Sequence, residues 1–454
     1  MTPRPARAGG GVASAVRGAL ALVAATVLVG AVRPAVAVGL VEVHALAVER
    51  DPTYAAALDD REAAAAELPL ARSALLPQLG ASAGAGLNRL EADGLEEDFD
   101  DTQWRVQIAQ PLFDRTSAAL VDQAGTAVAQ ADAELGNAAQ TLLLRVATLY
   151  VETLRASTNL AFARAELDAI EDQRELAERR FDTGLARVTD VLAAEAQADL
   201  AEAQRIAAFD ALDAAREALL TVTGVDPGEL RVLAPDLPLL PPEPADIDAW
   251  AAFAVRGNPE LAVARLAAEV AGAGIAVERG ARWPSVELVA SAGADDTDRA
   301  LREGETRSAR LGVQATLPLY TGGRIGARVA RARAGAEAAR DRLAGARRAA
   351  EQRARDGYRG TLAAIARVRA LGRALVSTTR SAEAVETGFR NGTRTSDDVL
   401  RALRETFRAR TDLANARHDY VLSTLSLEAA TGALSVADLE AVDRFLVPAG
   451  ALDR

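Results

Sequence analysis

The sequence contains no cysteine and no lysine, and its only histidines are His44 and His418. Without cysteine, the chain forms no disulfide, no zinc–thiolate site and no thiol nucleophile. Without lysine, it has neither the phosphate-binding lysine of a P-loop nor a Schiff-base lysine, and all 52 basic residues are arginine. Two isolated histidines supply neither a metal-ligand cluster nor a Ser/His/Asp triad. We therefore expect a protein that is not an enzyme and that holds no cofactor or metal.

Aromatic residues and positive charge are also scarce. Aromatic residues make up 4 % of the 454 residues, and 64 acidic side chains outnumber the 52 basic ones, for a net charge of −12. A nucleic-acid-binding protein needs a basic face, so no nucleic-acid partner is expected. Half of the residues are apolar, which is enough for a sizeable core. The length allows roughly two to four domains or one large repeated unit.

Long apolar runs are missing except near the N-terminus. Three arginines within the first 17 residues precede an uncharged, mostly apolar run at 18–32, and an Ala-Val-Ala cleavage signature follows at 35–37. This order predicts a secretory signal peptide at 1–37. The alternative is a transmembrane anchor, but the run is shorter than the roughly 20 residues that a spanning helix needs. The remaining chain is expected to contain no transmembrane helix.

The chain consists of two similar halves. Four landmarks recur at a spacing of 207 or 208 residues: Leu76-Pro77 with Trp283-Pro284, Pro111-Leu112-Phe113 with Pro318-Leu319-Tyr320, Asp190-Val191-Leu192 with Asp398-Val399-Leu400, and Thr223-Gly224 with Thr431-Gly432. The halves are placed at 38–224 and 247–432, and a tail follows at 433–454. Between them, 225–246 contains six prolines and is predicted to be a stiff linker.

Each half is predicted to contain a helix, two strands, a very long helix, a glycine-containing turn and another long helix. The first helices are expected at about 43–74 and 247–281. Apolar and polar residues alternate over 79–88, 104–112, 286–293 and 311–319, as in strands with one apolar face. A tilted strand of about 10 residues crosses an outer membrane. Soluble hairpins with one buried face are the alternative, but an export signal and four matched strands favour a membrane barrel.

Aromatic residues near the ends of these segments suit the interfacial girdles of such a barrel. They are Trp104, Phe113, Trp283 and Tyr320.

A polar loop is expected to join the strands of each pair. The acidic residues of the two loops are Glu91, Asp93, Glu96, Glu97, Asp98, Asp100 and Asp101 in the first and Asp295, Asp296, Asp298, Glu303 and Glu305 in the second. Solvated acidic loops are favoured over Ca²⁺ sites, because the carboxylates lack an ordered ligand spacing.

Four strands cannot close a membrane barrel, and an open sheet edge is not tolerated in lipid. The chain must therefore oligomerise. Three copies would supply 12 strands and an aqueous lumen, whereas two would supply 8 strands with a filled interior.

The remaining helices are long enough to cross a periplasm. They are predicted at 116–180, 188–220, 324–390 and 396–431. The first would span roughly 98 Å as one helix at 1.5 Å per residue. Modest apolar stripes with interleaved Glu and Arg are typical of coiled-coil walls, so a soluble periplasmic coiled-coil scaffold is a second hypothesis for the whole chain.

The phrases at the turns between the long helices carry a family resemblance. Arg180-Phe181-Asp182-Thr183-Gly184-Leu185-Ala186-Arg187-Val188-Thr189-Asp190-Val191 and Gly388-Phe389-Arg390-Asn391-Gly392-Thr393-Arg394-Thr395-Ser396-Asp397-Asp398-Val399-Leu400 lie one repeat apart. Together with the strand-to-helix phrases at 110–114 and 317–324, these sequences resemble the TolC family of outer-membrane efflux and secretion channels. The resemblance covers residues 40–435.

The resemblance implies a mainly α fold with a small β part, located in the outer membrane with a long periplasmic extension. Four strands from each protomer of a homotrimer would close one 12-stranded barrel in outer-membrane lipid, and the helices would continue it as an α-helical tunnel. A periplasmic adaptor would open the narrowed inner tip and link it to an inner-membrane pump of the RND or ABC type. The channel itself would perform no catalysis, and its cargo is left open between drugs, metal ions and proteins.

The resemblance also assigns site residues. Asp190, Phe389, Arg394 and Asp398 match positions that link neighbouring helices in the closed state, and Gly184, Leu185, Gly392 and Thr393 match tip positions that meet the adaptor. One position departs from the family pattern: Arg401 stands where a second gate aspartate is found, one turn after Asp398. This exchange changes the charge expected in the pore.

Overall fold

The computed structural model describes residues 37–92, 95–299 and 304–448. The predicted signal peptide at 1–37 therefore lies, except for Ala37, outside the described residues. The elements are α1 (Leu40–Arg50), α2 (Pro52–Ser73), β1 (Gln78–Ala92), β2 (Leu95–Phe113), α3 (Arg115–Asp182), α4 (Val188–Thr223), β3 (Val232–Leu233), α5 (Ile247–Gly257), α6 (Pro259–Gly280), β4 (Ser285–Thr297), β5 (Gly304–Thr316), α7 (Arg324–Arg390), α8 (Ser396–Thr431), α9 (Val436–Asp443) and β6 (Leu446–Val447).

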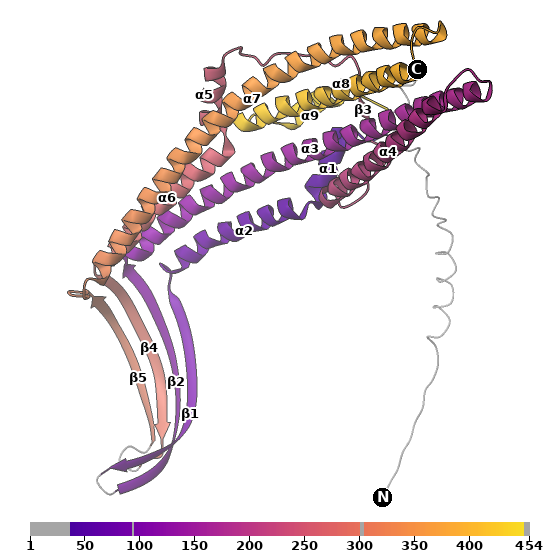
Figure 1. Cartoon of the computed structure of the whole chain (residues 1–454). Helices are drawn as coiled ribbons and strands as arrows, with labels where there is room; N and C mark the ends of the chain where they lie inside the picture. Colours follow the sequence, from indigo (N-terminus) through magenta and orange to yellow (C-terminus); the bar gives the residue numbers. More distant parts are fainter. Residues whose placement is uncertain (1–36, 93–94, 300–303, 449–454) are drawn as a thin grey trace, which may run out of the picture.

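The molecule is a long, curved helical body with a sheet at one end (Figure 1). α3 has 68 residues and α7 has 67, so each spans roughly 100 Å. The hairpin turns between α3 and α4 and between α7 and α8 lie together at the end opposite the sheet. The long helices agree closely with the sequence prediction, and no helix of the described residues combines the length and apolar character that crossing a membrane requires.

The first helix of each half is broken, which corrects the prediction of one continuous helix at 43–74 and at 247–281. The breaks fall at Asp51 and Asn258, whose backbones are extended. Each is followed by a proline at the first position of the next helix, where a missing N–H is harmless. Asp51 accepts a hydrogen bond from the Tyr54 backbone N–H, and Asn258 accepts one from Leu261. The Asp-Pro and Asn-Pro pairs therefore end one helix and cap the next.

The four long strands form one antiparallel sheet in the order β1-β2-β4-β5. Their lengths are 15, 19, 13 and 13 residues, which exceeds the predicted 10. The prediction of acidic loops is wrong for most of the acidic residues, because β1 and β2 pair from Gln78–Ala109 through to Ala92–Leu95. Asp93 and Glu303 lie outside the described residues, and β5 ends at Thr316, before the predicted limit of 319.

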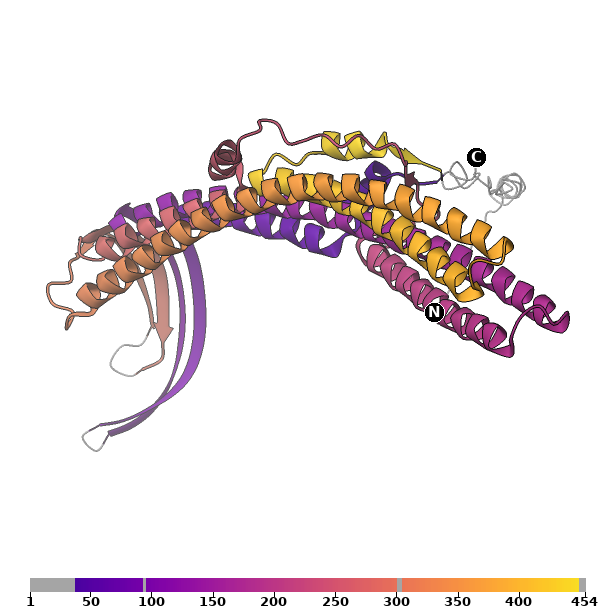
Figure 2. The same cartoon turned by 45° about the horizontal axis from the view of Figure 1, so that its top comes forward.

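The helices adjoin one another in the same order as the strands that they continue. α2 leads into β1, β2 leads into α3, α6 leads into β4, and β5 leads into α7. α2 packs against α3, α3 against α6, and α6 against α7. Sheet and helices thus form one continuous curved wall, with β1 and α2 at one edge and β5 and α7 at the other (Figures 1 and 2).

The main core lies midway along the helices. It joins α1, α3, α4, α7, α8 and α9, and its centre includes the fully buried Tyr150, Val146 and Leu425. The proline-rich linker and the C-terminal tail cover this level, because β3 within the linker pairs with β6 in the tail. Figure 2 shows α5, α9 and the linker along one side of the long helices.

Candidate functional site

The turn between α3 and α4 forms the first tip. Gly184 has a φ of 73°, a left-handed conformation that favours glycine. The backbone N–H of Leu185 donates to the carbonyl of Arg180 at 2.7 Å, which closes the end of α3. Asp190, in the first turn of α4, accepts a hydrogen bond from the Arg187 backbone N–H at 3.1 Å. The predicted tip glycine is therefore structurally required, and Asp190 caps its own helix.

The turn between α7 and α8 repeats this geometry. Gly392 has a φ of 74°, and the backbone N–H of Thr393 donates to the Gly388 carbonyl at 2.8 Å. Asp398 accepts from the Thr395 N–H at 3.0 Å and from the Thr395 hydroxyl at 2.9 Å. These two bonds hold the pKa of the Asp398 carboxyl below its usual value, and the positive charge of Arg394 adds to the effect.

The two tips contact each other within one chain. The Arg180 guanidinium lies over the ring of Phe389, 4.6 Å from its centroid. Farther from the turns, Leu400 of α8 is buried in an apolar cluster with Ile170 of α3 and Ala194 of α4. Phe389 thus joins the two hairpins of one chain. Its partner Arg180 is not among the predicted site residues, although an arginine in one tip and an aromatic residue in the other are visible in the sequence.

The four predicted gate residues are close to the tips but are not joined to one another as one network. Among the described residues, no hydrogen bond or ion pair links Asp190 to Arg394 or Asp398. Asp190 lies 3.6 Å from Arg187 of its own hairpin. Arg401, at the position that departs from the family pattern, pairs with Asp397. Each acid is therefore satisfied inside its own hairpin.

Exposed apolar side chains surround the first tip. Leu185 is 70 % exposed, and Leu192, Val188 and Phe181 are also solvent-exposed. An uncovered group of large apolar side chains at the end of a molecule indicates a contact surface. Gly184 and Gly392 have no atom within 4 Å of where a Cβ would stand, so the turns themselves are open.

The aromatic residues predicted for the membrane girdles occupy two levels. Phe113 ends β2, Trp283 lies just before β4 and Tyr320 lies just after β5, so these three mark the junction of sheet and helices. The Arg115 guanidinium lies 5.3 Å from the Trp283 ring centroid. Trp104 lies nine residues along β2 from Phe113, which is roughly 30 Å at the usual rise per residue. With the usual tilt of a barrel strand, this separation is close to the roughly 25 Å apolar band of an outer-membrane barrel.

The strand segments beyond Trp104 carry the acidic residues. Arg89 of β1 pairs with Glu96 at 2.5 Å and Asp98 at 3.2 Å, and Arg299 lies 3.6 Å from Glu97. Among the described residues, no group of three or more His, Asp or Glu side chains is arranged to hold a metal ion.

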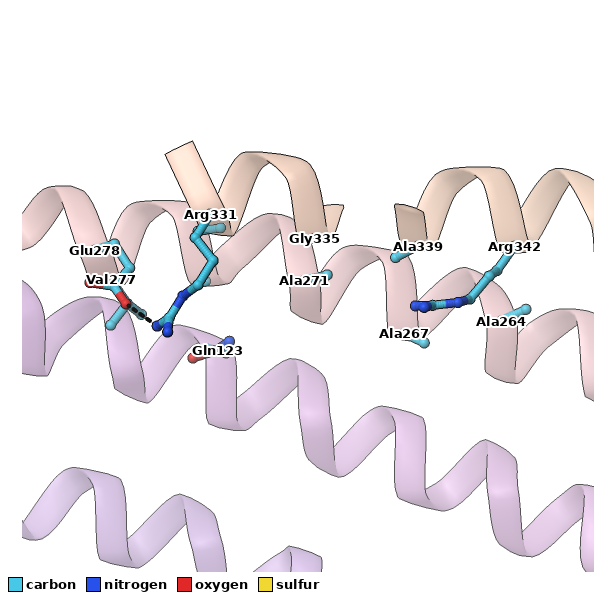
Figure 3. Close-up of a pocket in the computed structure, with 12 residues that line it drawn as sticks. Gln123, Ala264, Ala267, Ala271, Val277, Glu278, Arg331, Gly335, Ala339 and Arg342 are labelled. Atoms are coloured by element: carbon cyan, nitrogen blue, oxygen red, sulfur yellow. Dashed lines mark ion pairs between the residues drawn. The ribbon is translucent and has the colours of Figure 1, made fainter. Parts of the chain in front are cut away.

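A shallow groove follows the seam where α6 and α7 meet α3 (Figure 3). Small residues line it, including Ala267 and Ala271 of α6 and Gly335 of α7. Arg331 crosses one end and lies 3.5 Å from Glu278. Small side chains let neighbouring helices approach closely but fill little of the space between them. We therefore attribute the groove to the packing of α6 against α3 and α7.

A buried histidine in the middle of the molecule was not anticipated as a structural element. His418 of α8 is 3 % exposed. Burial lowers its pKa to about 4, and the charges of Arg155 and Arg417 act in the same direction, while Asp419 opposes them. Arg155 donates to Asp419 at 2.7 Å, so the histidine lies beside an ion pair between α3 and α8.

A sheet of long strands that continue end to end into helices, two of them about 100 Å long, is the architecture of a membrane channel with a helical tunnel. The chain belongs to the outer membrane efflux protein family, whose model matches residues 43–225 and 253–433. The outer membrane protein TolC of Vibrio cholerae is 35 % identical over 404 residues, with 88 % of this chain and 92 % of the relative covered. The alkaline protease secretion protein AprF of Pseudomonas aeruginosa is 31 % identical over 422 residues, with 90 % and 87 % covered.

Solved structures support the same fold. The outer membrane protein VceC of Vibrio cholerae superposes with a TM-score of 0.74 at 22 % identity, with 87 % of this chain and 96 % of that chain covered. The chain is thus a TolC-family exit duct of the outer membrane for efflux or secretion. This assignment confirms the family resemblance and sets aside the soluble coiled-coil scaffold.

Proposed function

We propose that three copies of this chain assemble into one channel, with a 12-stranded barrel in the outer membrane and a helical tunnel in the periplasm. The supporting observation is the curved wall, in which the strand order β1-β2-β4-β5 repeats the helix order α2-α3-α6-α7. β1 and β5 each pair with a single described strand. An unpaired strand edge is not tolerated in lipid, so β1 and α2 of one protomer meet β5 and α7 of the next.

The absence of cysteine makes this arrangement easy to test. Ser82 of β1 is replaced by Cys in combination with Thr306→Cys, Ser308→Cys or Arg310→Cys on β5, which scans the register. We expect disulfide-linked ladders of up to three chains after mild oxidation. The control combines Ser82→Cys with Ser291→Cys on β4, which lies two strands from any β1 of the assembly. Ladders absent from all three pairs, together with a one-chain mass by light scattering, would contradict the trimer.

We further propose that a periplasmic adaptor binds the tips and opens them, and that an inner-membrane pump of the RND or ABC type drives export through the duct. The exposed apolar residues Leu185, Val188 and Leu192 support a docking surface. The turn residues Gly184, Leu185, Gly392 and Thr393 are its candidate contacts. The four aromatic residues Trp104, Phe113, Trp283 and Tyr320 are proposed to lie at the two membrane interfaces, since their levels match the thickness of the apolar band.

The closed state is proposed to depend on Asp190, Phe389, Arg394 and Asp398 at the contacts between neighbouring hairpins. Arg394 is the sharpest probe, because it is exposed and the capping bonds of Asp398 do not require it. Arg394→Ser is expected to raise single-channel conductance in planar bilayers, as is Asp190→Ala combined with Asp398→Ala. Arg408→Ser, at an exposed position of α8 and away from the turn, is the control. A conductance equal to that of the unaltered channel in every variant would refute the gate assignment.

The cargo is proposed to include both small molecules and proteins. The relatives include one named for alkaline protease secretion and another named for protease secretion, while the family is named for efflux. Growth in the presence of exported drugs and secretion of a marker protease, measured in a strain lacking its own duct, would separate the two activities.

A further inference from the structure

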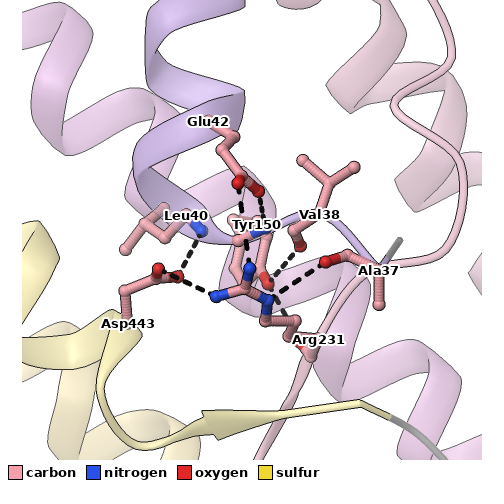
Figure 4. Close-up of polar contacts among 8 residues, drawn as sticks. Ala37, Val38, Leu40, Glu42, Tyr150, Arg231 and Asp443 are labelled. Carbon is pink, nitrogen blue, oxygen red and sulfur yellow. Dashed lines mark hydrogen bonds and ion pairs between the residues drawn. The ribbon is translucent and has the colours of Figure 1, made fainter.

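A cluster of charged and polar groups surrounds the start of the described chain, at the level of the main core (Figure 4). Its side chains come from four separate parts of the sequence: Glu42 in α1, Tyr150 in α3, Arg231 in the linker and Asp443 in α9. Tyr150 is fully buried, and its hydroxyl bonds to the carbonyls of Val38 at 3.1 Å and Arg231 at 2.9 Å. The backbone at Val38 is thus part of the cluster.

The first backbone groups after Ala37 are all engaged. The Val38 N–H donates to the Glu229 carbonyl at 2.7 Å, and Val38 forms a parallel bridge with Leu230 of the linker. The next N–H, of Gly39, donates to the Glu42 carboxylate at 2.6 Å. The N–H of Leu40 donates to the Asp443 carboxylate at 2.8 Å. The Glu42 and Asp443 carboxylates therefore bind the first and the second backbone N–H group after that of Val38.

Arg231 is the only side-chain cation among the groups that face this backbone in the described part of the cluster. It lies 3.7 Å from Glu42 and 3.2 Å from Asp443, and its Nε donates to the Ala37 carbonyl at 3.0 Å. Two carboxylates thus outnumber one guanidinium, and the partial positive charge at the start of α1 does not fully offset the difference. The cluster therefore carries a net negative charge, which one more cation would neutralise.

We propose that the cluster is the docking site of the mature N-terminus, formed by hydrolysis of the Ala37–Val38 bond. Water adds its oxygen to the Ala37 carbonyl carbon and the bond to the Val38 nitrogen breaks. Ala37 leaves with the preceding segment as a carboxylate, and Val38 keeps a free α-ammonium group. That group retains the bond to the Glu229 carbonyl, and the next two backbone N–H groups, of Gly39 and Leu40, donate to Glu42 and Asp443. The Ala-Val-Ala signature at 35–37 places hydrolysis at this bond, and the position of the cluster is a separate observation on the folded chain.

The tight packing around Val38 also determines whether cleavage or closure of the cluster comes first. Ala37 is 9 % exposed, and a Cβ at Gly39 would overlap the Asp443 carboxylate, so the backbone here is tightly enclosed. A peptidase cannot reach the bond once the linker and α9 cover it. Cleavage therefore precedes closure of the cluster, and the released ammonium links α1, the linker and α9 only in the processed chain.

The absence of lysine allows a direct test, because a free N-terminus at Val38 would be the only primary amine of the mature chain. The full chain is expressed with its own N-terminal segment, purified from the outer membrane in detergent, and its first residue is identified by mass spectrometry. The folded channel and the same protein in guanidinium are then acetylated with an N-hydroxysuccinimide ester. We expect Val38 as the first residue and at least a tenfold slower reaction in the folded channel.

Variants that remove a carboxylate distinguish an ammonium group that is bound by these charges from one that is only buried. Glu42→Gln and Asp443→Asn are expected to speed acetylation of the folded channel several-fold, because each removes a negative charge that is bound to the backbone within two residues of the ammonium. Glu49→Gln in α1 and Glu440→Gln in α9 are matched controls at exposed positions of the same helices and should leave the rate unchanged. Reductive methylation with ¹³C-formaldehyde keeps the charge and reports the same group by NMR, which gives a second measurement on the unaltered channel. We expect its pKa to lie above the usual 7.7–8.0 of an α-amino group.

Three results would overturn the proposal. They are a first residue other than Val38, equal acetylation rates in the folded and unfolded protein, and a methylated N-terminus that titrates at or below the usual pKa.

Discussion

One buried carboxylate, that of Asp51, stabilises the break between α1 and α2, and the effect of removing this carboxylate can be predicted quantitatively. Asp51 is 3 % exposed. It accepts a hydrogen bond from the Tyr54 N–H at 2.8 Å, and it lies 2.5 Å from Nη2 of Arg145 on α3. Asp51 thus both caps α2 and ties it to the long helix. We predict that Asp51→Ala weakens the start of α2 and that Asp51→Asn weakens it less.

The two contributions can be estimated separately. Loss of the cap costs about 1 kcal/mol. Loss of a hydrogen bond to a charged group costs about 1–2 kcal/mol here, because the Arg145 side chain is 33 % exposed and regains some water. Asp51→Ala should therefore destabilise the first turn of α2 by about 2–3 kcal/mol, which is roughly a 30- to 150-fold loss of protection. Asp51→Asn keeps a capping oxygen and should lose about 1–2 kcal/mol, or roughly 5- to 30-fold.

Hydrogen–deuterium exchange of the detergent-solubilised channel measures this local opening directly. The relevant amides are those of residues 54–57, and the exposed Asp60→Ala in the same helix is the control, with an expected change of about twofold or less. The reasoning fails if Asp51→Ala changes protection no more than Asp60→Ala does. It also fails if the Asn and Ala variants are equal, because the cap would then contribute nothing.

Three further changes test other levels of the molecule. Leu400→Ala should lower the free energy of unfolding by about 2–5 kcal/mol and loosen the tip, measured by calorimetry and single-channel conductance, because Leu400 is 1 % exposed between the hairpins. His418 has a folded-state pKa of about 4 against a usual 6.5, so stability is fully present above pH 6.5 and falls by up to about 3 kcal/mol toward pH 4. Thermal midpoints between pH 7.5 and 4.5 check this slope, which His418→Gln should largely remove. Gly392→Ala should destabilise the second tip by about 1–2 kcal/mol at its φ of 74°, seen as faster proteolysis there.

The long elements were predictable because their signals are local and repeated. The predicted limits of α7 and α8 coincide with the structure, since glycine and polar capping residues end both helices in sequence. The alternation predicts all four strands but underestimates their length. Their acidic ends carry polar residues on both faces, so period two disappears although the backbone pairing between β1 and β2 continues.

Other features were missed for two different reasons. The breaks at Asp51-Pro52 and Asn258-Pro259 have a clear local signal, a capping residue before a proline, and the two pairs are one repeat apart. The pairing of β3 with β6 and the cluster around Arg231 depend on residues more than 200 positions apart, which no local pattern reveals. The contact of Arg180 with Phe389 likewise needs both hairpins to be placed side by side.

The position of the main core follows from how the wall is built. Near the sheet, each chain contributes α2, α3, α6 and α7 to the wall, whereas near the tips it contributes α3, α4, α7 and α8. α3 and α7 run through both levels, so two helices must end and two must begin at the middle. Helix ends leave backbone groups without intrahelical partners, and these need capping and cover. The extra elements α1, α5, α9 and the β3–β6 pair lie at this level, together with the buried capping residues Asp51 and Asn258. The short first helix of each half, together with the linker and the C-terminal tail, therefore covers the helix ends in the middle of the wall.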